Sequence, residues 1–147
     1  MAAKPRPPAA PGTPKERTIL IVDDDEDARE SLRGILESSL AGARVVEAGS
    51  VAQAKEILGA KAVDLILSDY QMPGSDGLEF LKDVRAAKDD VPTILMTAYP
   101  AMGLAVKALQ EAKIQGFAVK PLGKEQILTL VKRALEKDSG FGYQAPE

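Results

Sequence analysis

The sequence predicts one α/β domain, built on a five-stranded parallel sheet that is doubly wound, with helices on both faces. Five short apolar runs alternate with five segments of helical period between residues 18 and 137. Alternating β and α units imply parallel strands joined by right-handed crossovers. A length of 147 residues suits one hydrophobic core, and 45% hydrophobic but only 4% aromatic residues make that core aliphatic.

The predicted strands are short and mostly apolar. Residues 18–22 form a run of the kind that is buried on both faces of a parallel sheet. The other predicted strands span residues 44–48, 63–68, 93–96 and 116–119.

The predicted helices carry apolar residues three or four positions apart. Ser50 is a favourable N-cap for the second helix, and Gly59 is expected to end it. The five helices are expected over residues 27–40, 51–58, 77–86, 101–113 and 124–137.

The folded domain is expected to span residues 17–137, between two tails. Residues 1–16 contain five of the ten prolines, and such a segment buries too little apolar surface to offset its ordering entropy. We expect a disordered Pro/Ala-rich tail there. Residues 138–147 are predicted to be a flexible, solvated tail, with docking of Phe141 and Tyr143 on the surface as the alternative.

The composition excludes several classes of function. The net charge is −3 and no long run of Lys or Arg is present, which argues against direct binding of nucleic acid. The absence of Cys and His rules out disulfides, thiolate or histidine metal sites, a Ser-His-Asp triad and a phosphohistidine. No stretch is long and apolar enough for a secretory signal or membrane span, so we expect a soluble, cytoplasmic protein.

Polar residues gather where four of the predicted strands end. Asp23, Asp24 and Asp25 follow the first strand, and Asp69 ends the third. Thr97 follows the fourth strand and Lys120 the fifth. In open parallel sheets, ligands bind outside the carboxyl ends of the strands, so these side chains should meet at one edge.

Such a cluster suits phosphoryl chemistry assisted by a metal ion. Carboxylates repel one another unless a cation lies among them, and oxygen ligands without His or Cys favour Mg²⁺. Lys120 would neutralise a phosphoryl oxygen, Thr97 would donate a hydrogen bond, and a carboxylate would act as the nucleophile. Ordinary alternatives exist: Glu26 and Asp27 complement a helix dipole, and a single Thr or Lys at a strand end is commonly solvated.

Four segments at these strand ends resemble a known family. They read ILIVDDDED at 19–27, LILSDYQMPGSDGLEFL at 65–81, ILMTAYP at 94–100 and GFAVKPL at 116–122. In this order and spacing, residues 17–137 resemble the receiver domains of two-component response regulators, in particular single-domain regulators like those of chemotaxis. The resemblance implies a flavodoxin-like (βα)₅ fold with strand order 2-1-3-4-5.

The resemblance also implies a role for each site residue. Asp69 would accept a phosphoryl group from the phosphohistidine of a sensor histidine kinase or phosphotransfer protein. Thr97 and Lys120 would contact that group, and the bond between Lys120 and Pro121 would be cis. The Mg²⁺ ligands would be Asp23, Asp24, Asp69 and the backbone carbonyl of Gln71.

A conformational switch is implied as well. Phe117 matches an aromatic residue that turns inward when Thr97 moves toward the phosphate, although a plain core residue is the alternative. Tyr99 and Gln71 match positions that tune the lifetime of the acyl phosphate. A downstream protein would bind the face formed by residues 101–113, 116–119 and 124–137. Candidate contacts there, which would otherwise be solvated helix face, are Lys107, Gln110, Lys113, Lys124 and Lys132.

We therefore expect a phosphorylation-activated switch that assists only its own phosphorylation and dephosphorylation, not an enzyme acting on other substrates. If the chain is complete, it is a stand-alone receiver; if it is a fragment, its tails are linkers. A haloacid-dehalogenase-type phosphohydrolase with Asp23 and Asp25 as a D-x-D pair is one competitor. A nucleotide-binding module lacks its glycine-rich motif, and a degenerate receiver would serve only as a scaffold.

Overall fold

The computed structural model describes residues 16–87, 90–98, 102–136 and 142–145. A six-stranded sheet runs through its centre in the order β2-β1-β3-β6-β7-β8, and every neighbouring pair is parallel. The strands are β1 (Arg17–Val22), β2 (Ala43–Ala48), β3 (Leu65–Asp69), β6 (Thr93–Thr97), β7 (Gly116–Val119) and β8 (Gly142–Gln144). The first five confirm the predicted fold class and the strand order 2-1-3-4-5.

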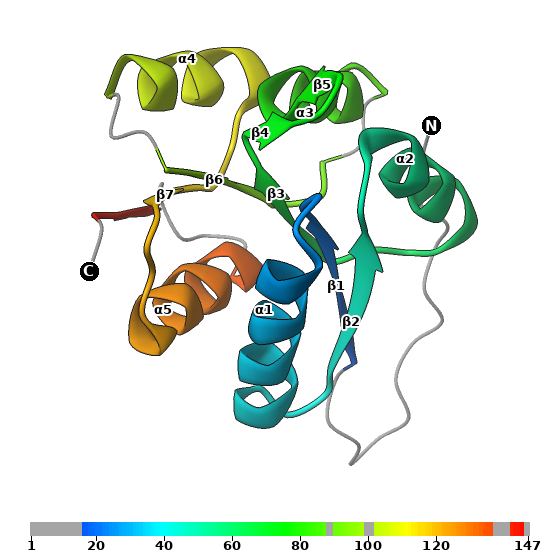
Figure 1. Cartoon of the computed structure of the whole chain (residues 1–147), viewed down its shortest axis with the longest axis vertical. Coiled ribbons are helices and arrows are strands. Elements are labelled where there is room, and N and C mark those ends of the chain that lie inside the picture. Colours follow the sequence, from blue (N-terminus) through cyan, green and yellow to red (C-terminus); the bar gives the residue numbers. More distant parts are fainter. Residues whose placement is uncertain (1–15, 88–89, 99–101, 137–141, 146–147) are drawn as a thin grey trace.

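Helices cover both faces of the sheet (Figure 1). On one face lie α1 (Glu26–Ser39) and α5 (Lys124–Leu135), and on the other lie α2 (Val51–Ala60), α3 (Gly77–Ala86) and α4 (Met102–Ala112). Alternate residues of β1 show why: Ile19 and Ile21 pack toward α1 and α5, whereas Leu20 and Val22 pack toward the other three helices. The two resulting core layers are mainly aliphatic, as predicted.

Several local features differ from the sequence prediction. Gly59 does not end α2 but lies inside it, because the helix continues to Ala60 and is capped at Lys61. A small antiparallel hairpin, β4 (Gln71–Met72) and β5 (Ser75–Asp76), follows β3 and turns at Gly74, whose φ of 73° suits glycine. The predicted N-cap is confirmed, since Ser50 Oγ accepts a hydrogen bond from the Gln53 amide at 3.1 Å.

The C-terminal segment also differs. Residues 138–147 were expected to be a loose tail, yet residues 142–144 form β8 and pair with β7 along its edge. Phe141 lies outside the described residues. Of the predicted N-terminal tail, 1–16, residues 1–15 lie outside them too.

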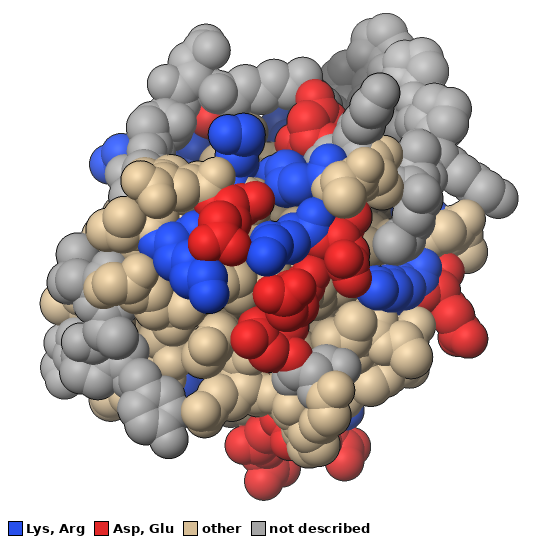
Figure 2. All heavy atoms as spheres, turned by 90° about the horizontal axis from the view of Figure 1, so that it is seen from above, with Lys and Arg blue, Asp and Glu red and all other residues tan. Residues whose placement is uncertain are grey.

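Acidic and basic groups are interspersed on the face shown in Figure 2, which looks down on α2, α3 and α4. Ion pairs on these helices include Lys82 with Glu79 and Glu111, and Lys55 with Asp83. Among the described residues of this face, the two signs alternate and form no continuous basic track. Within the described ranges, no helix is long and apolar enough to cross a bilayer.

Candidate functional site

The predicted site residues lie at the carboxyl edge of the sheet. Asp69 is the last residue of β3 and Thr97 the last of β6, while Asp23 and Lys120 directly follow β1 and β7. The strand registers pair Val22 with Ser68, Asp69 with Met96 and Thr97 with Val119, so the four strands end within two residues of one another at the same edge. The edge therefore collects side chains from four separate parts of the chain.

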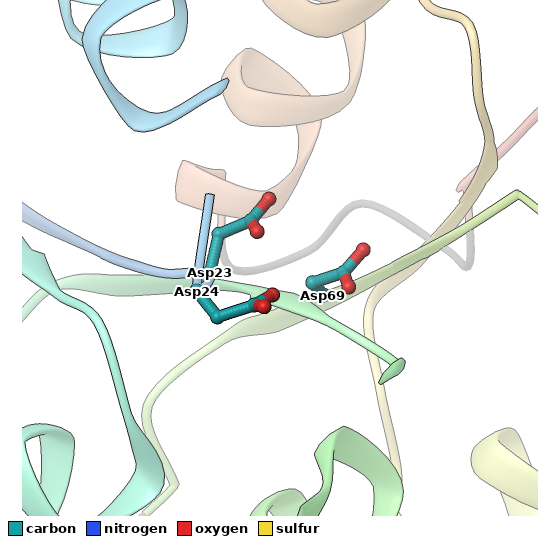
Figure 3. Close-up of side chains that lie close together, drawn as sticks. All are labelled: Asp23, Asp24 and Asp69. Carbon is teal, nitrogen blue, oxygen red and sulfur yellow. The ribbon is translucent and has the colours of Figure 1, made fainter. Parts of the chain in front are cut away.

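Three carboxylates converge there (Figure 3). One oxygen each from Asp23, Asp24 and Asp69 lies within 4.8 Å of the others. Asp23 is buried and Asp69 nearly so, whereas Asp24 is exposed. An open cleft on the Asp24 side is lined by Asp24, Tyr70, Gln71, Met72, Pro73 and Asp76. The cleft therefore borders the cluster at Asp24 and at Tyr70 and Gln71, the two residues that follow Asp69.

Lys120 partly neutralises the cluster. Its Nζ lies 2.8 Å from Asp69 Oδ1 and 3.3 Å from Asp23 Oδ2. The peptide bond between Lys120 and Pro121 is cis, as the resemblance implied. One ammonium beside three carboxylates leaves the cluster with net negative charge, which favours a bound cation.

The protonation equilibria reflect this crowding. Burial raises the pKa of Asp69 above its usual value; the hydrogen bond and charge of Lys120 oppose this, and the charge of Asp23 adds to it. Burial alone would lower the pKa of Lys120, but its hydrogen bond to Asp69 and the charges of both carboxylates leave that pKa raised. Asp69 is thus a carboxylate held in a poorly hydrated place next to a cation.

The loop after β1 is held by contacts that orient Asp23. Asp23 Oδ1 accepts a hydrogen bond from the Asp25 amide at 3.0 Å. Arg29 Nη1 donates to the Asp23 carbonyl at 2.6 Å, while its Nε pairs with Glu47 of β2 at 3.1 Å. Asp25 itself caps α1 by accepting from the Asp27 amide, and does not belong to the carboxylate cluster.

Sequence reasoning missed Arg29. It is the fourth residue of α1, at the helix end where the dipole favours acidic rather than basic side chains. An arginine at this unfavourable position is the one feature of the sequence that indicates a specific partner for its side chain.

The loop after β3 depends on a glycine. A Cβ atom at Gly77 would lie 2.0 Å from the carbonyl oxygen of Asp69, and the Gly77 amide donates to the Tyr70 carbonyl at 2.7 Å. No other residue allows α3 to start this close to the end of β3. The sequence analysis placed a helix over residues 77–86 but did not reveal this close approach at its first residue.

The remaining predicted residues are less closely tied to the cluster. Thr97 is buried at the end of β6, and its carbonyl accepts a hydrogen bond from the Lys120 amide at 2.7 Å. The Gln71 backbone hydrogen-bonds to Asp69. Phe117 lies in the core on the α3 and α4 side, not in the cluster, and Tyr99 lies outside the described residues.

A comparison with models of known protein families identifies the family of this chain. The model described as "response regulator receiver domain" matches residues 19–132. The chain belongs to the response regulator receiver family. It is therefore a receiver domain of phosphorylation-activated signal transduction, as the resemblance indicated.

Curated relatives of this receiver domain are longer proteins. It is 37% identical over 121 residues to the DNA-binding transcriptional regulator NtrC of Escherichia coli K12, covering 80% of this chain and 24% of NtrC. It is 33% identical over 120 residues to the C4-dicarboxylate transport transcriptional regulatory protein DctD of Rhizobium meliloti, covering 82% of this chain and 25% of DctD. The chain thus spans only about a quarter of either relative.

Solved structures of similar size share the fold. The signal receiver domain of an HD domain-containing protein from Pseudomonas fluorescens Pf-5 matches with a TM-score of 0.77 and 28% identity, covering 84% of this chain and 97% of that one. The chemotaxis response regulator CheY4 of Vibrio cholerae matches with a TM-score of 0.72 and 26% identity, covering 82% and 99%. The receiver domain therefore corresponds to the whole of these chains.

Proposed function

We propose that Asp69 of this receiver domain is the phosphoryl acceptor and that Mg²⁺ assists the transfer. The observation that carries this proposal is the position of the Asp69 carboxylate. It lies 2.8 Å from Lys120 Nζ and within 4.8 Å of carboxylate oxygens of Asp23 and Asp24, beside an open cleft. Phosphoryl transfer needs mostly positioning and charge neutralisation, and this arrangement supplies both.

The donor would be the phosphohistidine of a sensor histidine kinase or phosphotransfer protein. An oxygen of Asp69 forms a bond to phosphorus while the phosphorus–nitrogen bond breaks, giving an acyl phosphate and an imidazole that takes up a proton. Lys120 then shifts its contact from the carboxylate to a phosphoryl oxygen. Thr97, at the end of the adjacent strand, donates a hydrogen bond to another oxygen.

The donor set fits Mg²⁺. Asp23, Asp24 and Asp69 offer carboxylate oxygens, the Gln71 carbonyl would add a fourth, and the cluster contains no nitrogen or sulfur ligand. Hard cations take ligand sets of this kind, and Mg²⁺ retains waters that a phosphoryl oxygen can replace. When bound, the ion would neutralise charge that builds up on the transferred group.

The output would be a change of protein binding rather than chemistry on another substrate. Phosphorylation adds about −1.5 to −2 charge beside Thr97 and Lys120, which would bias the contacts of these two residues between two states. Phe117 would follow Thr97 by repacking, and a downstream protein would read the face of α4, β7 and α5. We place this action in the cytoplasm, without direct contact to nucleic acid or membrane.

Acetyl phosphate with Mg²⁺, followed by intact mass spectrometry, tests the proposal. We expect one added phosphoryl group on the wild-type chain, and none on Asp69→Asn or without Mg²⁺. Asp76→Asn is the matched control, because Asp76 lies in the same cleft and Asn still caps α3.

A phosphoryl group that persists on Asp69→Asn would overturn the assignment of Asp69. If labelling moved to Asp23, the haloacid-dehalogenase-type reaction would be favoured instead. Absence of any adduct on the wild type would leave a scaffold that binds partners without being phosphorylated.

A further inference from the structure

The C-terminal strand β8 occupies the outer edge of β7 (Figure 1). Gly142, Tyr143 and Gln144 lie opposite Gly116, Phe117 and Ala118 in parallel register. The Gly142 amide donates to the Gln115 carbonyl at 2.9 Å. The segment therefore uses the backbone groups by which any extended chain can add to a sheet.

The side chains around β8 also fit it closely. The ring of Tyr143 stacks on Phe117, with centroids 6.1 Å apart and an interplanar angle of 9°. A Cβ at position 142 would lie 3.1 Å from Leu130 Cδ2, so glycine suits the contact with α5.

A polar contact fastens the end of the segment. Gln126 Nε2 donates to the Ala145 carbonyl at 2.7 Å, while its Oε1 accepts from the Gly123 amide at 2.9 Å. One side chain thus caps α5 and holds the chain that leaves β8.

Together, these contacts hold β8 only weakly against β7. Three residues make few hydrogen bonds, and Tyr143 remains 40% exposed although it covers Phe117. Elements with little buried surface open first in the native state. When β8 opens, β7 becomes the edge strand, and unpaired edges accept other chains.

We propose that the edge of β7 is a strand-addition site for an extended polypeptide, which residues 142–145 of this chain occupy in cis. A partner segment would compete with β8 if it places glycine against Leu130, an aromatic ring against Phe117 and a carbonyl near Gln126. This inference rests on backbone and packing geometry at the sheet edge and does not depend on phosphorylation of Asp69.

The test uses the full chain and a synthetic peptide of residues 140–146, GFGYQAP, as the probe. Gly142→Pro removes the amide that donates to Gln115 and crowds Leu130, so it should release β8. Binding is followed by the amide shifts of Phe117, Ala118 and Gln126, without Mg²⁺ or a phosphoryl donor.

We expect the peptide to bind Gly142→Pro about tenfold more tightly than the wild type. In the wild type the peptide must displace β8, which costs about one net hydrogen bond and one ring contact. Tyr143→Phe is the matched control. This variant keeps the stacked ring, so β8 should stay in place and the peptide should bind as weakly as it binds the wild type. A peptide with alanine in place of the tyrosine should bind more weakly.

Equal affinity of the two proteins for the peptide, or shifts that miss β7, would overturn the proposal. The wild type gives a second readout that needs no variant. Its Gly142 amide should exchange with solvent about tenfold more slowly than in an unstructured chain. An unprotected Gly142 amide would show that β8 does not occupy the edge.

Discussion

Gly77 shows how one residue sets the position of the acceptor. Its missing side chain lets α3 begin against the Asp69 carbonyl, where a Cβ would be only 2.0 Å away. We predict that Gly77→Ala lowers the free energy of unfolding by about 1–3 kcal/mol, the range for overpacking a close contact. Because the shift acts on the backbone of Asp69, the yield of phosphorylated protein should fall as well.

Urea denaturation measures the first effect, and intact mass the second. Gly77→Ala with wild-type stability and wild-type phosphorylation would contradict the close approach. Gly34→Ala in α1 is the matched control.

Asp69 makes stability depend on pH in a defined direction. Its pKa in the folded protein is raised above the usual 3.8, mainly by burial. Folding therefore favours the protonated form: the stabilising contribution is complete below the unfolded-state pKa and is lost as pH rises through the folded-state pKa.

We accordingly predict that Asp69→Asn is more stable than the wild type at neutral pH in the presence of a chelator. This advantage should shrink as the pH is lowered toward the ordinary Asp range, and Tm measured across pH checks it. A mutant that is less stable than the wild type at neutral pH would show that the Lys120 contact outweighs the cost of burial.

Some site residues could be predicted from the sequence and others could not, for a physical reason. Asp23, Asp24, Asp69 and Lys120 follow apolar strands, and the parallel topology alone brings such positions together. Arg29 and Gly77 act on backbone atoms, through the carbonyls of Asp23 and Asp69. A pattern of side chains does not reveal which backbone groups need a partner or space.

Among the helices and strands, those long enough to show a regular pattern of apolar residues were predicted, and the shortest ones were missed. The strands and helices of the (βα)₅ unit depend on apolar periodicity, and their observed bounds lie close to those predicted. The hairpin β4–β5 and the strand β8 are two or three residues long, too short to carry a period. Gly59 misled because glycine commonly ends a helix, but it is also tolerated inside one at a small entropic cost, and α2 continues to Ala60.

Helix α1 provides the control for Gly77. Gly34 lies within this helix and a Cβ there would meet nothing within 4 Å. We predict that Gly34→Ala raises the free energy of unfolding by about 0.5–1 kcal/mol, because alanine loses less backbone entropy in a helix. Urea denaturation would contradict this if the variant were less stable than the wild type.

At the scale of the whole molecule, the site lies where the strand order reverses. The chain goes from β1 outward to β2 and then crosses to β3 on the other side of β1. The connecting helices α1 and α2 lie on opposite faces of the sheet there. In open α/β sheets, ligands bind at such a point, outside the carboxyl ends of the strands. Asp23 and Asp69 occupy those two ends, so the fold itself places the acceptor beside the metal ligands.

The most direct test of this account is a crystal structure of the chain with Mg²⁺ and beryllium fluoride, a stable mimic of the phosphoryl group. We predict beryllium on an oxygen of Asp69, and Mg²⁺ bound by Asp23, Asp24, Asp69 and the Gln71 carbonyl. The fluorines should contact Lys120 Nζ and the Thr97 hydroxyl. A metal ion held elsewhere, or a fluoride adduct that neither Lys120 nor Thr97 reaches, would contradict it.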